Sequence, residues 1–134
     1  MTRLGDFDFS GLLNFKNGLD KLREHAPAFQ EECLKELVSR LFAKTVARTP
    51  VLTGELRRGW SIGPIQRVGS QIQIEIINPV EYAMYVEYGH RTKDHRGWVE
   101  GRFMFTTSIE ELERELPAIL ERKLEQFIKE HLRW

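Results

Sequence analysis

The most regular hydrophobic pattern in the chain lies between Phe29 and Val46. Apolar residues recur there at steps of three and four, which places them in one stripe along an α-helix, with charged residues on the other side. Pro50 ends the pattern, because a residue that precedes proline avoids the helical conformation. The sequence therefore predicts an amphipathic helix of about 20 residues, roughly 30 Å long. Its stripe consists of Phe29, Cys33, Leu34, Leu37, Val38, Leu41, Phe42 and Val46.

Residues 1–26 form a less well defined N-terminal segment. Apolar residues have roughly helical spacing from Ser10 onward, and Ser10 is a suitable N-cap, but Gly18 weakens a helix at this place. Pro27 either ends this segment or begins the next element. We expect a short or frayed helix over about 10–26.

Beyond a turn at residues 49–54, apolar residues occur at alternate positions. They are Trp60 and Ile62 before a second turn at residues 68–70, and Ile72, Ile74 and Ile76 after it. Alternation of this kind predicts an antiparallel hairpin with one buried face. Pro64 cannot donate a ladder hydrogen bond, so it indicates an edge strand or a bulge.

The segment after the hairpin admits two interpretations. Asn78 is a good N-cap, Pro79 suits the first helical position, and Glu81 stands where a capping-box acid belongs, which predicts a short helix over 79–88. Gly89 can close that helix in the left-handed conformation. The alternative is a third strand, because the three tyrosines and the valine of this segment also suit a sheet.

The C-terminal third begins with a polar stretch at residues 90–101 that has no periodicity, and we expect a long exposed loop there. The apolar segment 103–105 follows as a candidate short strand. A capping-box pattern at Ser108 then starts a second amphipathic helix, which Pro117 should kink or divide. Helices and strands that do not alternate as βαβ units predict one α+β domain over residues 1–134.

Composition excludes some classes of protein but does not indicate a function. The chain has 134 residues, and its 20 basic and 20 acidic residues cancel, so net charge gives no argument for nucleic acid or an anionic membrane. The longest apolar run, residues 82–86, is far too short to span a bilayer, and the N-terminus lacks the pattern of a signal peptide. The single cysteine, Cys33, is expected to be a small buried apolar residue. These features favour the cytoplasm.

Candidate chemistry gathers in the expected loop. His90, Asp94 and His95 could bind a metal and serve a hydrolase, but their spacing matches no ligand motif. Residues 91–102 carry four basic and two acidic side chains, a weak signal for nucleic acid that would use Arg91, Lys93, Arg96 and Arg102. Trp98 in an exposed loop favours a protein interface instead, and the alternative is that it folds back on the core. Our candidate interface residues are Arg91, Lys93, His95, Arg96 and Trp98.

Three segments in order carry a resemblance. The first is a P-x-x-T-G-x-L-R pattern formed by Pro50, Thr53, Gly54, Leu56 and Arg57. The second is Y-A-x-Y-V-E-x-G, which includes Tyr82, Ala83, Glu87 and Gly89, and the third contains Phe103. Together, over roughly residues 28–130, they resemble the phage tail-component family of long-tailed bacteriophages and prophages. His90 stands where that family usually has threonine, and Gly101 and Arg102 where it often has prolines.

The resemblance implies a small structural protein of the virion neck, which joins the DNA-filled head to the tail or completes the tail. It implies no cofactor, no metal and no catalytic residue. The partners it implies are other copies of the chain in a ring, with six-fold symmetry suggested by the family, and the connector or tail proteins on either side. Non-specific contact with DNA in the lumen is compatible with this reading.

The two patterns also prompt a structural hypothesis. Thr53 and Gly54 would form a turn whose glycine permits a positive φ, and Leu56 would begin the buried face. Arg57 and Glu87 carry opposite charges within the two patterns. We hypothesise that they form an ion pair that braces the hairpin against the segment 79–88.

Overall fold

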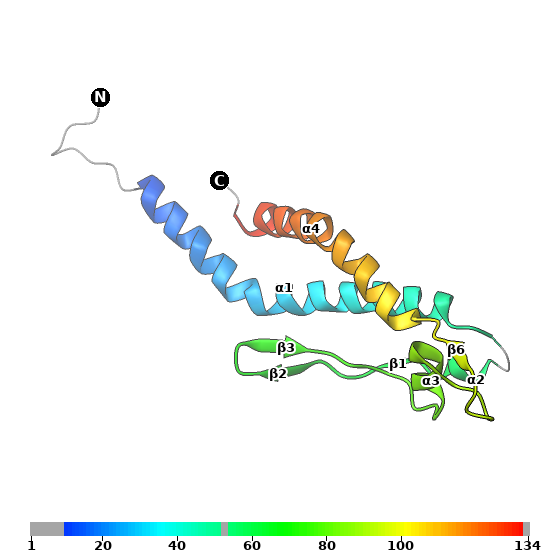
Figure 1. Cartoon of the computed structure of the whole chain (residues 1–134). Coiled ribbons are helices and arrows are strands. Elements are labelled where there is room, and N and C mark those ends of the chain that lie inside the picture. The colour runs from blue at the N-terminus through cyan, green and yellow to red at the C-terminus, as the bar shows by residue number, and fades with distance from the viewer. Residues whose placement is uncertain (1–9, 52–53, 133–134) are drawn as a thin grey trace.

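The structure is a computed structural model that describes residues 10–51 and 54–132. Two long helices, α1 (Ser10–Arg48) and α4 (Met104–His131), form the body, and short elements connect them. Between them come α2 (Glu55–Arg58), β1 (Ser61–Ile62), β2 (Gln66–Val68), β3 (Gln71–Gln73), β4 (Ile76–Ile77), α3 (Ala83–Tyr88), β5 (Gly89–Arg91) and β6 (Trp98–Glu100). The predicted α+β class is confirmed. In Figure 1, α1 lies between α4 and the β2–β3 hairpin.

The α1–α4 contact contains most of the core. Cys33 of α1 is buried there, as are Met104 and Ile119 of α4, and burial raises the pKa of the Cys33 thiol. Val38 of α1 is also buried, on the side of the helix that faces the arm formed by β1–β4. The Phe29 and Phe127 rings stack at 4.3 Å between their centroids. The apolar stripe predicted for residues 29–46 therefore packs as expected, and Cys33 is the small buried side chain that we predicted.

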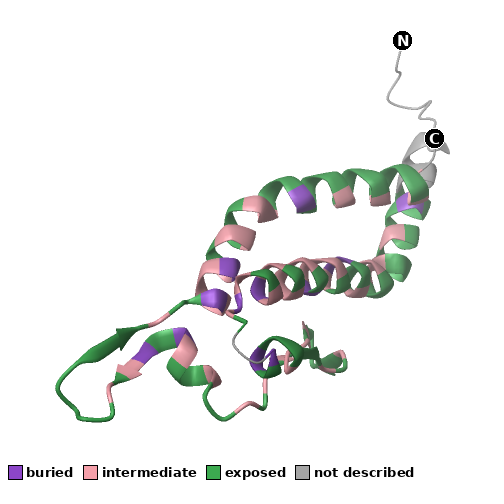
Figure 2. Ribbon diagram, turned by 90° about the vertical axis from the view of Figure 1, so that its right-hand side faces the viewer, coloured by how far each residue is buried: buried purple, intermediate pink, exposed green. Residues whose placement is uncertain are grey.

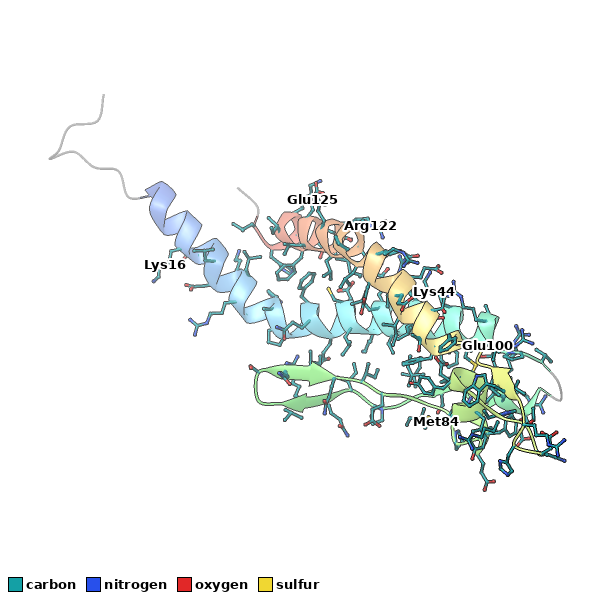
Figure 3. The ribbon with its side chains drawn as sticks, viewed as in Figure 1. Lys16, Lys44, Met84, Glu100, Arg122 and Glu125 are labelled. Atoms are coloured by element: carbon teal, nitrogen blue, oxygen red, sulfur yellow. The ribbon has the colours of Figure 1, made fainter. Side chains whose placement is uncertain are left out.

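A charge network joins the same two helices near the start of α4. Lys44 donates to Glu111 and, at 2.8 Å, to Glu115, while Arg48 donates to Glu111. Because two cations surround the Glu111 carboxylate, its pKa falls from 4.5 to about 2. The same hydrogen bonds raise the pKa of Lys44. Lys44 points from α1 toward α4 in Figure 3.

The prolines bend the helices without ending them. Pro27 lies inside α1, so the prediction of two separate N-terminal elements was wrong: one helix of 39 residues runs from Ser10 to Arg48. The packing of α1 along its length against α4 outweighs one missing backbone hydrogen bond. The carbonyl of Pro27 accepts a hydrogen bond from the Arg67 side chain at 2.8 Å. Pro117 lies inside an undivided α4, and both helices change direction in Figure 1, as expected of internal prolines.

The predicted hairpin is present as a narrow two-stranded arm. β1 pairs with β4, and β2 pairs with β3, both antiparallel, with Gly69 at φ 62° in the turn. The ladder is interrupted at Pro64, where the sequence predicted a bulge or an edge. The predicted buried face is covered incompletely, because Ile62 stays exposed and Ile72, Ile74 and Ile76 are half-buried.

The link between α1 and the arm follows the first sequence pattern. α1 ends at Arg48, shortly before Pro50, and Gly54 adopts φ 80° as predicted; Thr53 lies outside the described residues. The sequence did not predict the single-turn helix α2, which follows and buries Leu56. Trp60 then donates from its indole N–H to Thr49 Oγ1 at 2.8 Å and stacks on Phe105 at 6.1 Å.

The later elements differ from prediction at three places. Helix α3 is present, but it begins at Ala83, with Tyr82 at the N-cap position. Asn78 accepts from the N–H of Val80 and donates to the carbonyl of Leu56 in the turn before it. The expected loop 90–101 contains the β5–β6 hairpin. The expected strand 103–105 is wrong, and so is the helix start at Ser108: α4 begins at Met104, and Ser108 is buried inside it.

Candidate interaction surface

Two glycines hold the β5–β6 hairpin close to α3. Gly89 follows the last residue of α3 and has φ 91° with an extended ψ of 172°, so it ends the helix with a positive φ but not in the left-handed helical conformation we expected. A Cβ at Gly89 would lie 2.5 Å from the carbonyl oxygen of Val99, and one at Gly101 would lie 2.4 Å from that of Glu87. Backbone therefore meets backbone at the base of the hairpin, where no side chain fits.

Glu87 joins this base to the beginning of α4. The residue is 6% exposed, and its carboxylate accepts from the backbone N–H groups of Phe105 and Thr106, both at 2.9 Å, and from the Thr106 hydroxyl at 2.7 Å. These are the free N–H groups of a helix N-terminus, where a negative charge is also favoured by the helix dipole. A side chain distant in sequence thus caps α4.

The residues just before α4 also form backbone hydrogen bonds to α3. The N–H of Arg102 donates to the carbonyl of Val86 at 2.7 Å, and the N–H of Phe103 donates to that of Glu87 at 3.0 Å. Phe103 has φ 48° and meets the ring of Tyr88 edge-on at 6.4 Å. The second and third sequence patterns therefore form one structural unit, which fixes where the β5–β6 hairpin projects.

The hypothesis of an Arg57–Glu87 ion pair is wrong. Glu87 is occupied by the N-terminus of α4. Arg57 instead donates to the carbonyls of Val46 and Ala47 at 3.1 and 3.4 Å, at the C-terminal end of α1. Both charges do cap a helix end, one negative at an N-terminus and one positive at a C-terminus, which is the arrangement that the helix dipole favours.

The tip of the hairpin is ordered by its own hydrogen bonds. Thr92 donates from its hydroxyl to Asp94 and accepts from the N–H of Gly97 at 3.0 Å, while the N–H of Arg96 donates to Asp94 at 3.1 Å. These bonds lower the pKa of Asp94. His95 completes the turn with φ 58°. The tip is therefore a preorganised turn within the segment that the sequence predicts as a long exposed loop.

The predicted interface residues are brought together on this hairpin. Arg91, Lys93, His95 and Arg96 are all exposed around the tip, and the Trp98 side chain is 58% exposed. Sequence reasoning missed the apolar side chains that continue this surface onto α3, namely Met84, Tyr85 and Tyr88, which are 66%, 59% and 53% exposed. Met84 and Glu100 mark this end of the molecule in Figure 3. We call Met84, Tyr85, Tyr88 and Trp98 the aromatic patch.

The three residues considered for a metal do not converge. His90 packs edge-on against Tyr85 at 5.8 Å, and Asp94 is engaged within the tip. Over residues 10–51 and 54–132 no group of three His, Cys, Asp or Glu side chains could hold a metal ion. In the same part of the chain no helix has the length and apolar character needed to cross a membrane.

Comparison with known families gives the class of the protein. The model of the family described as "Bacteriophage HK97-gp10, putative tail-component" matches residues 14–89, more than half of the chain. The match includes α1, the arm and the Glu87 motif. This match identifies the class of the protein as a bacteriophage tail component. The chain belongs to the HK97-gp10-like family. No curated protein and no solved structure matches it.

Proposed function

We propose that this tail component is a structural protein of the head–tail junction, which acts by assembling into a ring and docking on its neighbours. It is made in the host cytoplasm and carried in the neck of the virion. It makes or breaks no bond, and its function is the shape that several copies present together.

The observation that carries the proposal is the amount of surface that one chain leaves uncovered. In the described part of the chain, six large apolar residues are each more than half exposed: Val51, Val68, Met84, Tyr85, Tyr88 and Trp98. In Figure 2 the buried residues form short stretches, and exposed residues cover most of the strands and the outward faces of the helices. Such a chain needs neighbours to bury its apolar side chains.

The β5–β6 hairpin is the proposed docking element. Its base is fixed by Glu87, Gly89 and Gly101, and its tip is fixed by Asp94, so binding costs little ordering of the backbone. Trp98 and the rest of the aromatic patch supply the apolar anchor, and the basic tip favours an acidic surface on the connector or tail protein. Copies around the axis make head-to-tail contacts that close by rotation, and the family resemblance favours six of them.

A second candidate function is nucleic-acid binding by the same tip. Arg91, Lys93 and Arg96 are all exposed on this hairpin, which would allow contact with DNA that passes through the lumen of the ring. Binding of this kind weakens steeply with salt, because it depends on counterion release. Salt-dependent binding of duplex DNA that is lost when all three residues are changed to alanine would favour this function; no binding at low salt would exclude it.

Labelling of intact virions tests the first proposal. An antibody raised against the purified chain and coupled to gold is applied to particles of the parent phage. Label at the junction between head and tail is the expected result. Label at the distal end of the tail, or protein absent from purified particles, would overturn the assignment.

A further inference from the structure

The outer side of α4 carries an apolar stripe that the described part of the chain leaves partly exposed. Leu120, Leu124 and Ile128 are 38%, 48% and 41% exposed, and their spacing of four residues aligns them on one side of the helix. Each follows directly after an inward-facing residue, the last two after Lys123 and Phe127, so the stripe lies roughly 100° around the helix from the α1 contact. We call these three residues the α4 stripe. Arg122 and Glu125 extend from the same helix in Figure 3.

A groove lies on a different part of the molecule, between α1 and the β arm. Its apolar wall is formed by Val38 of α1 and by Ile62, Ile65 and Ile74 of the arm, and its volume is about 680 Å³. None of its lining residues belongs to α4. We call it the α1–arm groove. Four branched apolar side chains beside an open groove fit an apolar helix face.

The charges beside the two surfaces are opposite. Glu113 and Glu121 are exposed next to the α4 stripe. Lys35 and Arg67 line the groove, together with one acidic residue, Glu31, which is already paired with Arg67 at 3.3 Å. The groove therefore presents an excess positive charge where an incoming helix would bring negative charge, which orients the approach and fixes its register.

We propose that the α1–arm groove receives the α4 stripe of a second copy of this chain. The inference rests on the proposed ring assembly and names the surfaces that form it. Because the two surfaces differ, the contact is head-to-tail, and repetition around an axis closes a ring instead of ending at a two-fold dimer. It also covers apolar surface that the isolated chain leaves in water.

Cysteine cross-linking tests this contact. The full chain with Ile65→Cys and Leu124→Cys is oxidised mildly, with the native Cys33 left in place because it is buried. We expect a ladder of covalent oligomers from the double variant, and only dimers when the two single variants are mixed. The matched control, Val68→Cys with Leu124→Cys, moves the arm cysteine to a more exposed position outside the groove and should give no ladder.

Charge exchange gives an independent readout. Glu121→Lys or Lys35→Glu alone should weaken association about tenfold, and the two together should restore it. The contact would be overturned, with ring assembly left intact, by two results: association as weak in the double charge variant as in the single ones, or oligomers of the Ile65→Cys, Leu124→Cys variant that do not become cross-linked on oxidation.

Where the purified chain stays monomeric, the same cross-link is sought in particles assembled with the double variant. A ladder there supports the contact, and particles that contain the protein without a ladder overturn it. Particles that lack the protein would overturn the proposed function together with this inference.

Discussion

The carboxylate of Glu87 accepts two hydrogen bonds from Thr106, one from its backbone N–H and one from its hydroxyl, across 19 residues of sequence. This relationship ties the end of α3 to the start of α4. It explains why a glutamate belongs in the Y-V-E-x-G pattern: it completes a helix terminus that has no local side-chain cap.

Removal of that cap should destabilise the protein. Glu87→Ala leaves buried N–H groups of α4 without a partner, which we expect to cost about 2 kcal/mol in the free energy of unfolding. Urea denaturation measures the loss. Glu81→Ala, an exposed acid near the start of α3, is the control and should cost less than about 0.5 kcal/mol. Equal losses would show that the cap contributes nothing specific.

A double-mutant cycle tests whether Arg57 and Glu87 interact directly, as the sequence suggested, or cap separate helices. Because Arg57 and Glu87 cap different helices, the double-mutant cycle of Arg57→Ala and Glu87→Ala should give additive changes within about 0.5 kcal/mol. A coupling energy well above that value would restore the direct pair and contradict the present geometry.

The close approach at the base of the hairpin predicts a steric effect. Gly101→Ala would place a Cβ 2.4 Å from a backbone oxygen that cannot move freely, so we expect a loss of about 2 kcal/mol or more. Gly97→Ala meets only the Thr92 side chain at 3.3 Å and serves as the control. Thermal unfolding of both variants compares them, and a stable Gly101→Ala protein would mean that the hairpin base is looser than described.

The α1–α4 charge network predicts a pH dependence. The pKa of Glu111 is lowered to about 2 in the folded chain, so its ionised form stabilises the fold above its ordinary pKa of 4.5, and this stabilisation is lost as the pH falls toward 2. Glu111→Gln should therefore reduce the melting temperature at pH 7 and flatten its decline below pH 4.5. Glu110→Gln, one residue away and exposed, should keep the wild-type profile. Parallel profiles for wild type and Glu111→Gln would contradict the network.

A substitution at Trp98 should affect particle assembly without affecting the stability of the fold. Its side chain is 58% exposed, so Trp98→Ala should change the melting temperature little while reducing the yield of joined particles. Val68→Ala removes a side chain of equal fractional exposure at the tip of the arm and should affect neither. A full yield of infectious particles from Trp98→Ala would remove the aromatic patch from the docking surface.

The sequence predicts the elements whose signal is local. The periodic stripe of residues 29–46, the alternation around Gly69 and the positive φ of Gly54 all follow from neighbours in the chain, and all are present. The errors occur where distant residues decide. Pro27 was expected to end a helix, but packing against α4 carries the helix through it. The start of α4 was expected at Ser108, whereas the cap that starts it comes from Glu87.

The candidate surface also combines features that local sequence predicts with features that depend on distant residues. Exposure of Arg91 and Trp98 could be anticipated from a polar stretch, yet the stretch contains a hairpin because backbone at Gly89 and Gly101 can meet. The sequence around either glycine does not predict this contact, because the contact depends on two positions that are distant in the chain. The exposure of Met84 and Tyr85 could not be predicted either, because an amphipathic segment does not reveal whether its apolar side meets this chain or another.

Electron microscopy of particles made without this gene is the most direct test of a role at the head–tail junction. We expect filled heads and separate tails of normal length that do not join, and joining restored when the wild-type gene is supplied in trans. Misshapen or overlong tails would move the protein from joining to tail termination. Normal joined virions would contradict a role at the junction.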